Sequence, residues 1–269
     1  MRLLTSGPSA LLLAASLTLA SPALASASEP VARSAAAEPA ISIAAKSTQV
    51  ERGKKAVVTG TVANKKITRV TLQQKRVGTK WKAQATTKVK ADGSYKLKDK
   101  TTTAVMRKYR VISAAGPKQK SAKVTVGVYE WRDLTKMQPR VMAGWFVEKT
   151  VSVNGVAYGP AYRGWSQPAS SPALVDYNLN RDCVSLRARF GISDASDLAG
   201  RATISVASDD VAVYSKPFGI TQSEYVTLPL GTPFRVGMTF TVENPGGLPT
   251  APSVIPVVAQ PEVFCTSAK

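Results

Sequence analysis

The chain contains no histidine and only two cysteines, Cys183 and Cys265, among its 269 residues. The lack of histidine excludes a Ser-His-Asp triad, a Cys-His dyad and any zinc or iron site with imidazole ligands. Two cysteines are too few for a four-cysteine zinc site or a cysteine-ligated iron–sulfur cluster. No cofactor and no metal are therefore expected, and no catalytic constellation is visible, so the sequence favours a binding protein over an enzyme.

Acidic residues are scarce beside basic ones, because 17 Asp and Glu face 36 Lys and Arg and leave a formal net charge of +19. Between residues 46 and 123 there are 22 basic and 3 acidic residues. The whole excess of charge therefore lies in this segment, and the rest of the chain sums to zero. Two domains of different surface chemistry are expected, joined near residues 126–131.

Long apolar runs are also missing, apart from a short one near the N-terminus. Met1-Arg2 supplies a basic start, residues 10–15 are apolar, and Ala23-Leu24-Ala25 has the small-residue pattern of a cleavage site. This order predicts a secretory signal peptide over residues 1–25, followed by a flexible spacer over residues 26–40. No later stretch is long enough to span a bilayer. We expect a secreted, extracellular protein, with attachment to the cell wall as one option.

The basic segment has short β-branched or alternating runs and no helical periodicity. Asp92-Gly93 between two of these runs predicts a tight hairpin. About seven strands over residues 41–127 fit an immunoglobulin-like β-sandwich.

Basic residues recur at alternate positions of these strands, which predicts that they point outward. They are Lys80, Lys82, Lys88, Lys90, Lys96, Lys98, Lys108 and Arg110. The positions between them would fill the core, namely Trp81, Val89, Tyr95, Leu97, Tyr109 and Val111. Two interpretations stay open: a solvated outer face, or a binding surface for a polyanion such as wall polymer, anionic glycan or extracellular nucleic acid.

The second half, residues 128–269, alternates apolar and polar residues over 175–180, 184–190 and 234–242. Asn154-Gly155 predicts another hairpin. About eight strands here fit a jelly-roll β-sandwich. The expected fold class is therefore all-β, with two β-sandwich domains in sequence.

Each half also resembles a known kind of domain. Residues 41–127, with Val57–Val62, Val70–Lys75 and Ala91–Tyr95, resemble small secreted sandwich domains of actinobacterial cell-surface proteins, which are spacers and adhesion modules.

Residues 129–269 resemble the carbohydrate-binding-module family known as NPCBM, which has a galactose-binding-like β-sandwich fold. The segments that carry this second resemblance are 151–158, 175–179, 183–188, 191–194, 202–206 and 213–215. The chain departs from the family where a Gly-x-His-Ala-like turn is replaced by residues 164–169, and where an Asp-His-x-x-Trp-like turn is replaced by residues 248–255.

The resemblance implies a disulfide between Cys183 and Cys265, because the strands that carry them lie close together in that family. Predicted export supports the same pairing, since oxidising compartments preserve such bonds.

Sugar binding needs an aromatic ring for the apolar face of a pyranose and polar groups for its hydroxyls. The aromatic candidates are Trp131, Trp145, Tyr162 and Trp165, of which Trp165 stands in a loop and Trp131 is expected to be buried. The acidic residues most worth considering are Asp194, Asp197, Asp209 and Asp210, which stand between strands and suit turns better than a catalytic pair or a calcium site.

The sequence therefore predicts a non-catalytic glycan or wall-carbohydrate binder that uses Trp165, Tyr162, Trp145 and Asp194, with the basic domain aiding attachment. The alternative is a structural or adhesion protein held to polyanions without sugar binding.

Overall fold

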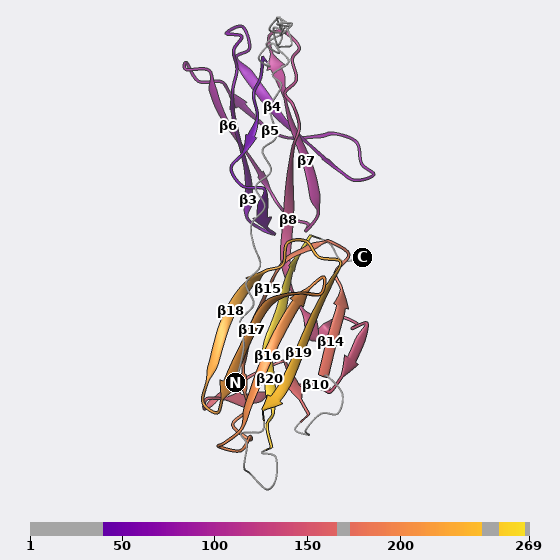
Figure 1. Cartoon of the computed structure of the whole chain (residues 1–269). Helices are drawn as coiled ribbons and strands as arrows, with labels where there is room; N and C mark the ends of the chain where they lie inside the picture. Colours follow the sequence, from indigo (N-terminus) through magenta and orange to yellow (C-terminus); the bar gives the residue numbers. More distant parts are fainter. Residues whose placement is uncertain (1–39, 166–172, 244–252, 267–269) are drawn as a thin grey trace, which may run out of the picture. The chain divides into compact units, whose positions relative to one another are not determined.

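The computed structural model describes residues 40–165, 173–243 and 253–266, which belong to one compact unit, Pro39–Lys269. The predicted signal peptide and residues 26–39 of the predicted spacer lie outside the described residues. The described chain is all-β, with several antiparallel sheets and one short 3-10 helix, η1 (Leu134–Lys136) (Figure 1). No helix in this part of the chain is long and apolar enough to cross a membrane.

The strands of the basic segment form two sheets around one hydrophobic cluster. In the smaller sheet, β3 (Lys55–Thr61) lies between β1 (Ala44–Ala45) and β6 (Ser94–Lys100). The larger has the strand order β5 (Lys82–Lys88), β4 (Arg69–Arg76), β7 (Met106–Ala115) and β8 (Val124–Asp133), with the short β2 (Gln49–Glu51) running parallel to β8. The shared core contains residues from both sheets, among them Val58, Leu72, Tyr95, Leu97, Tyr109 and Val111. Four of the six predicted core positions are thereby confirmed.

The prediction for Trp81 was wrong, because its side chain is half-buried and lies outside this core. A β-bulge between β4 and β5 is the cause: Leu72 pairs with Ala85, whereas the next residue, Gln73, pairs with Ala83. The extra residue reverses the alternation at the start of β5. Lys82 consequently pairs with the buried Gln74, and Trp81 takes the outward position.

The turn predicted at Asp92-Gly93 is present, with Gly93 at φ 81° and the Asp92 carboxylate accepting a hydrogen bond from the Ser94 N–H. The predicted hairpin is not, since β5 pairs with β4 and β6 pairs with β3. The turn therefore carries the chain from one sheet to the other.

A buried ion pair lies between these two sheets. Arg107 on β7 donates to Asp99 on β6 over 2.9 Å, and both side chains are more than nine-tenths buried. The Tyr109 hydroxyl donates to the same carboxylate oxygen over 2.7 Å. Burial, and then this hydrogen bond, raise the pKa of Tyr109. Removing either ion of such a pair leaves an uncompensated buried charge, so the pair fixes how β6 and β7 face each other.

The remaining strands continue the larger sheet through β8 and add a second sheet, and these two enclose a second core, whereas a separate hairpin covers a small third cluster with Val151 and Val153. One sheet joins β8 to β20 (Pro256–Cys265), β13 (Ala161–Gly164), β10 (Trp145–Glu148), β15 (Cys183–Ile192) and β18 (Ser223–Pro229). The other has the order β17 (Val211–Gly219), β16 (Arg201–Ser208), β19 (Arg235–Glu243), β14 (Ala173–Asn178) and β9 (Val141–Ala143). The hairpin is β11 (Val151–Val153) with β12 (Val156–Tyr158), which confirms the turn predicted at Asn154-Gly155.

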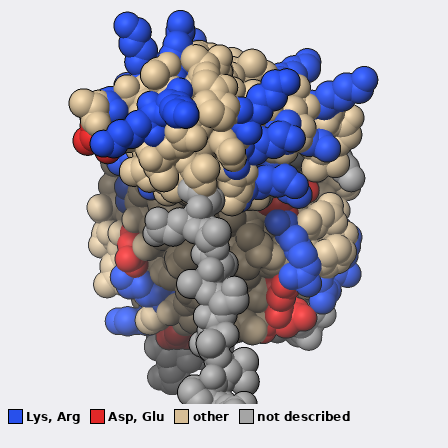
Figure 2. All heavy atoms as spheres, turned by 90° about the horizontal axis from the view of Figure 1, so that it is seen from above, with Lys and Arg blue, Asp and Glu red and all other residues tan. Residues whose placement is uncertain are grey.

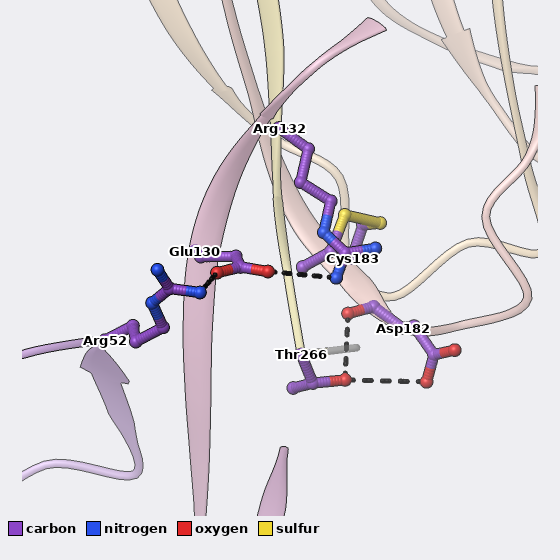
Figure 3. Close-up of polar contacts among 7 residues, drawn as sticks. Arg52, Glu130, Arg132, Asp182, Cys183 and Thr266 are labelled. Atoms are coloured by element: carbon purple, nitrogen blue, oxygen red, sulfur yellow. Dashed lines mark hydrogen bonds and ion pairs between the residues drawn. A yellow bond between two sulfur atoms is a disulfide. The ribbon is translucent and has the colours of Figure 1, made fainter. Parts of the chain in front are cut away.

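Strand β8 belongs to both groups of strands. Its residues 124–127 pair with β7, and its residues 130–133 pair with β20. Near this change of partner Glu130 accepts hydrogen bonds from Arg52, over 2.5 Å, and Arg132, over 3.1 Å (Figure 3). The join expected near residues 126–131 therefore falls inside one unbroken strand, and the division into domains at 127/128 stays a prediction.

The predicted disulfide between Cys183 and Cys265 is present. The two residues face each other across β15 and β20 and are separated by 82 residues of chain. Beside the disulfide, Thr266 donates to the Asp182 carbonyl over 3.3 Å (Figure 3). The disulfide attaches the C-terminal end of β20 to the neighbouring strand β15.

We expect replacement of both cysteines by alanine to lower the free energy of unfolding by about 2–5 kcal/mol, because the cross-link restricts the unfolded chain. Urea denaturation followed by circular dichroism measures the change. Thiol labelling of the denatured, unreduced wild-type protein should find no free thiol, and two labelled cysteines per chain would contradict the bridge in solution.

Candidate functional site

The eight predicted basic residues lie at the surface, seven exposed and Arg110 half-buried, but they do not form one patch. Lys96 and Lys98 alternate with core residues of β6, whereas Lys108 and Arg110 alternate with core residues of β7. Because the two strands lie in sheets on either side of that core, the two pairs point to opposite faces. Figure 2 shows Lys and Arg projecting around one face of the molecule, with Asp and Glu at few places.

The other four basic residues have separate surroundings. Lys80 and Lys82 line one shallow hollow, next to the buried Arg107–Asp99 pair. Lys88 pairs with Arg69 across β4 and β5. Lys90 adjoins the turn at Asp92–Gly93 and lines a different hollow.

Besides Arg76 and Arg107, of which Arg107 is buried against Asp99, three pairs of exposed like charges stand directly opposite each other on neighbouring strands of the basic segment. They are Lys55 with Lys100, Arg69 with Lys88 and Lys75 with Lys108. All six side chains are exposed, and within the described residues none forms an ion pair with an acidic side chain. Like charges opposite each other destabilise a sheet. Each pair is therefore a place where a bound anion would remove a repulsion.

One of these pairs borders an apolar hollow of about 340 Å³. Apolar contacts come from Trp81, Val77 and Met106, and the cations around them are Lys75, Arg76, Lys108 and Lys123. Sequence reasoning missed this site because it placed Trp81 in the core. The run from Lys75 to Trp81, with Gly78 in its middle, was the available signal for an exposed turn beside an aromatic residue.

The indole of Trp81 is held by Arg110 of β7. The guanidinium carbon lies 4.2 Å from the ring centroid, within the range of a cation–π contact. The Arg110 Nε donates to the side-chain oxygen of Gln73 over 2.8 Å, which fixes the guanidinium. This arrangement orients the ring on the outer face of the sheet.

The residues predicted to bind carbohydrate are not brought together. Trp145 and Tyr162 are buried, and their rings lie edge to face 6.4 Å apart in the second core. The Tyr162 hydroxyl donates to the Leu134 carbonyl over 3.0 Å and bonds the Tyr177 hydroxyl. Neither Trp145 nor Tyr162 offers a ring face to a surface ligand. Trp165 is 52% exposed, and its ring lies 5.2 Å from that of Phe146.

The carboxylate of Asp194 accepts hydrogen bonds from the backbone N–H groups of Asn154 and Gly155, over 2.7 and 2.9 Å. It thus holds the β11–β12 turn. Asp197 likewise accepts from the Ser253 N–H over 2.6 Å. Both acids stand in turns, as expected, but their carboxylates bond segments that are distant in the sequence rather than their own turns. Across the described ranges, no group of three or more His, Cys, Asp or Glu residues is placed to hold a metal ion.

Another polar hollow, of about 360 Å³, lies in the C-terminal half and was not predicted. It lies on the outer side of the sheet formed by β8, β20, β15 and β18, and Arg187, Glu262, Asp133, Tyr225 and Gln260 line it. Arg187 donates to Glu262 over 2.7 Å, and its guanidinium lies 4.0 Å from the centroid of Trp131, which is half-buried. The cation here is already neutralised by a partner within the chain.

No protein-family model matches this chain, and no curated protein matches it in sequence. The classification therefore stands at an all-β protein with several antiparallel sheets. Function has to be argued from the surfaces themselves.

Asp209 provides a test of the turn assignment. Its carboxylate accepts hydrogen bonds from the backbone N–H groups of Arg235 and Phe234, over 2.8 and 3.1 Å, and these bonds lower its pKa. Because the folded pKa lies below the unfolded value of about 4, the stabilisation is complete above that value and is lost as the pH falls below it. An Asp209→Asn variant should be less stable than wild type at pH 7, and the difference should shrink between pH 5 and pH 2. Urea denaturation across this range measures it, and a constant difference would contradict the assignment.

Proposed function

We propose that this chain is an exported, non-catalytic binding protein that its basic segment holds on anionic polymers. The observation that carries the proposal is the set of three exposed like-charge pairs on neighbouring strands, Lys55/Lys100, Arg69/Lys88 and Lys75/Lys108. A protein that needed only solubility would gain nothing from placing these charges in register, since each pair costs stability.

A polymer suits this surface better than a single small anion. Each face of the basic segment has cations at neighbouring positions, Lys96 and Lys98 on β6 and Lys75 beside Lys108 on the other sheet, so a chain of negative charges can contact several of them in sequence. Binding would release counterions and weaken steeply with added salt. For an exported protein the available polymers of this kind are wall polymers, anionic glycans and extracellular nucleic acid. Export itself is supported by the predicted signal peptide over residues 1–25 and by the disulfide.

The domain assignment belongs to the same proposal. The two sheets of the basic segment and their core support an immunoglobulin-like domain over residues 41–127. The two larger sheets and their core support a galactose-binding-like jelly roll over residues 128–269. In this arrangement the first domain provides attachment, and the second is free for a different contact.

A second candidate function is contact with a neutral glycan through the C-terminal half. The observation that favours it is the exposed aromatic pair formed by Trp165 and Phe146, whose rings lie 5.2 Å apart and tilted by 45°. Such a pair offers an apolar plane to a pyranose ring. Of the four residues expected to bind sugar, Trp165 is the one that retains this role.

The polyanion proposal predicts that Lys96→Glu combined with Lys98→Glu weakens retention on heparin and on immobilised polyphosphate and leaves folding intact. Both side chains are exposed, and surface substitutions of this kind change stability little. The salt concentration needed for elution should fall. The matched control is Lys136→Glu with Lys149→Glu, two exposed lysines outside the basic segment with the same change of charge. Equal losses in both variants, or retention that does not depend on salt, would contradict the proposal.

The glycan candidate predicts that the mature protein binds neutral oligosaccharides on an array and that Trp165→Ala abolishes the signal. Lys96→Glu with Lys98→Glu should leave this signal unchanged, because it removes no aromatic ring. An array without any positive oligosaccharide would eliminate this candidate and leave the polyanion proposal standing.

A further inference from the structure

The outward Trp81 is an unusual feature of a surface that is rich in lysine and arginine. A large aromatic side chain gains most free energy when it is buried. Trp81 is instead half-buried beside a hollow. The core on the other side of the sheet holds fully buried apolar residues of β4 and β7, such as Leu72 and Val111. The position of Trp81 therefore calls for an explanation other than packing.

We propose that the hollow beside Trp81 binds one sugar ring of an anionic glycan. The apolar face of the ring would lie against the indole, and its acidic group would lie between Lys75 and Lys108. This inference rests on the proposed polyanion binding and assigns it a specific site and ligand class.

The indole is oriented before any ligand arrives. Arg110 lies 4.2 Å from the ring centroid, and Gln73 holds Arg110 in place. Trp81 lines the hollow, whereas Arg110 does not, so the side chain that orients the ring leaves the hollow itself open. A ligand would thus meet a fixed ring and would pay little conformational entropy to order it.

The charges around the hollow suit a carboxylate, sulfate or phosphate. Lys75 and Lys108 are paired across β4 and β7, and Lys123 and Arg76 complete the cationic rim. An anionic group between Lys75 and Lys108 would turn a repulsion into two attractions. The volume of about 340 Å³ is at the lower end of the range of small-ligand sites, which fits one ring rather than a long segment.

A glycan fits these observations better than single-stranded nucleic acid. Proteins that bind single strands place successive bases on a series of aromatic side chains. Trp81 is the sole aromatic residue that lines this hollow. Sugar rings linked through acidic units need one platform and several cations, and this hollow has both.

The test uses the full-length mature protein, three probes and three variants. The probes are oligogalacturonate, which has sugar rings with carboxylates, polyphosphate, which has charge without rings, and oligothymidylate, which has bases and phosphates. The variants are Trp81→Ala, Trp81→Met, which keeps apolar bulk without a ring, and the control Phe234→Ala, which removes an exposed aromatic side chain of the C-terminal half. Circular dichroism verifies that each variant is folded.

Both Trp81 variants should bind oligogalacturonate about fivefold to tenfold more weakly, while their affinity for polyphosphate changes less than twofold. Phe234→Ala should bind both like wild type. An equal loss for both probes, or none, would overturn the assignment of Trp81. A greater loss for oligothymidylate than for oligogalacturonate would show a nucleic-acid site instead and would also overturn it. If the wild-type protein binds none of the three probes, the proposed function itself fails, whereas binding of polyphosphate alone defeats only this inference.

Discussion

The arrangement of the sheets depends on one strand, β8, and its two sets of backbone hydrogen bonds. Its first residues complete the sheet of the basic segment, and its last residues pair with β20. The disulfide reinforces the second partnership, because Cys265 faces both Glu130 of β8 and Cys183 of β15. Strand β20 is thereby fixed on two sides. Trp131 on β8 and Arg187 on β15 stack on the outer face of this sheet, and the pairing of β20 with both strands sets the distance between them.

The acidic residues of the basic segment explain why its surface charge stays unbalanced. Asp99 is buried, and its carboxylate accepts hydrogen bonds from Arg107 and Tyr109. Asp92 is exposed, but its carboxylate accepts the N–H of Ser94 in its own turn, and this bond lowers its pKa. Two of the three acids are thus committed to holding the fold. The lysines outside receive little compensation from them, so the surface of the basic segment keeps its excess of positive charge.

Alternation of residue types was sufficient to predict most of the strands and the core positions Tyr95, Leu97, Tyr109 and Val111. It failed at Trp81, because the bulge that reverses the alternation depends on how β5 pairs with β4, and that pairing is not visible in the local pattern. Trp145 and Tyr162 were misjudged for a related reason: a short strand gives too few alternations to show which face is covered by a second sheet. The disulfide was predictable because the chain has two cysteines and a predicted signal peptide. The pairing of β8 with β20 was not, because it joins residues more than a hundred positions apart in the chain.

The chain uses the same stacked pair twice, with opposite electrostatic outcomes. Arg187 lies over Trp131, and Arg110 lies over Trp81, at 4.0 and 4.2 Å from the respective ring centroids. Both tryptophans are half-buried on the outer side of a sheet, so packing alone does not distinguish them. The difference is the second partner of each arginine, which is the carboxylate of Glu262 for Arg187 and the neutral amide of Gln73 for Arg110. In the C-terminal half the motif is neutral as built, and in the basic segment it keeps its positive charge. The pair in the C-terminal half therefore has a structural role, because Glu262 neutralises its arginine. The pair in the basic segment keeps a net positive charge, which suits an anionic ligand.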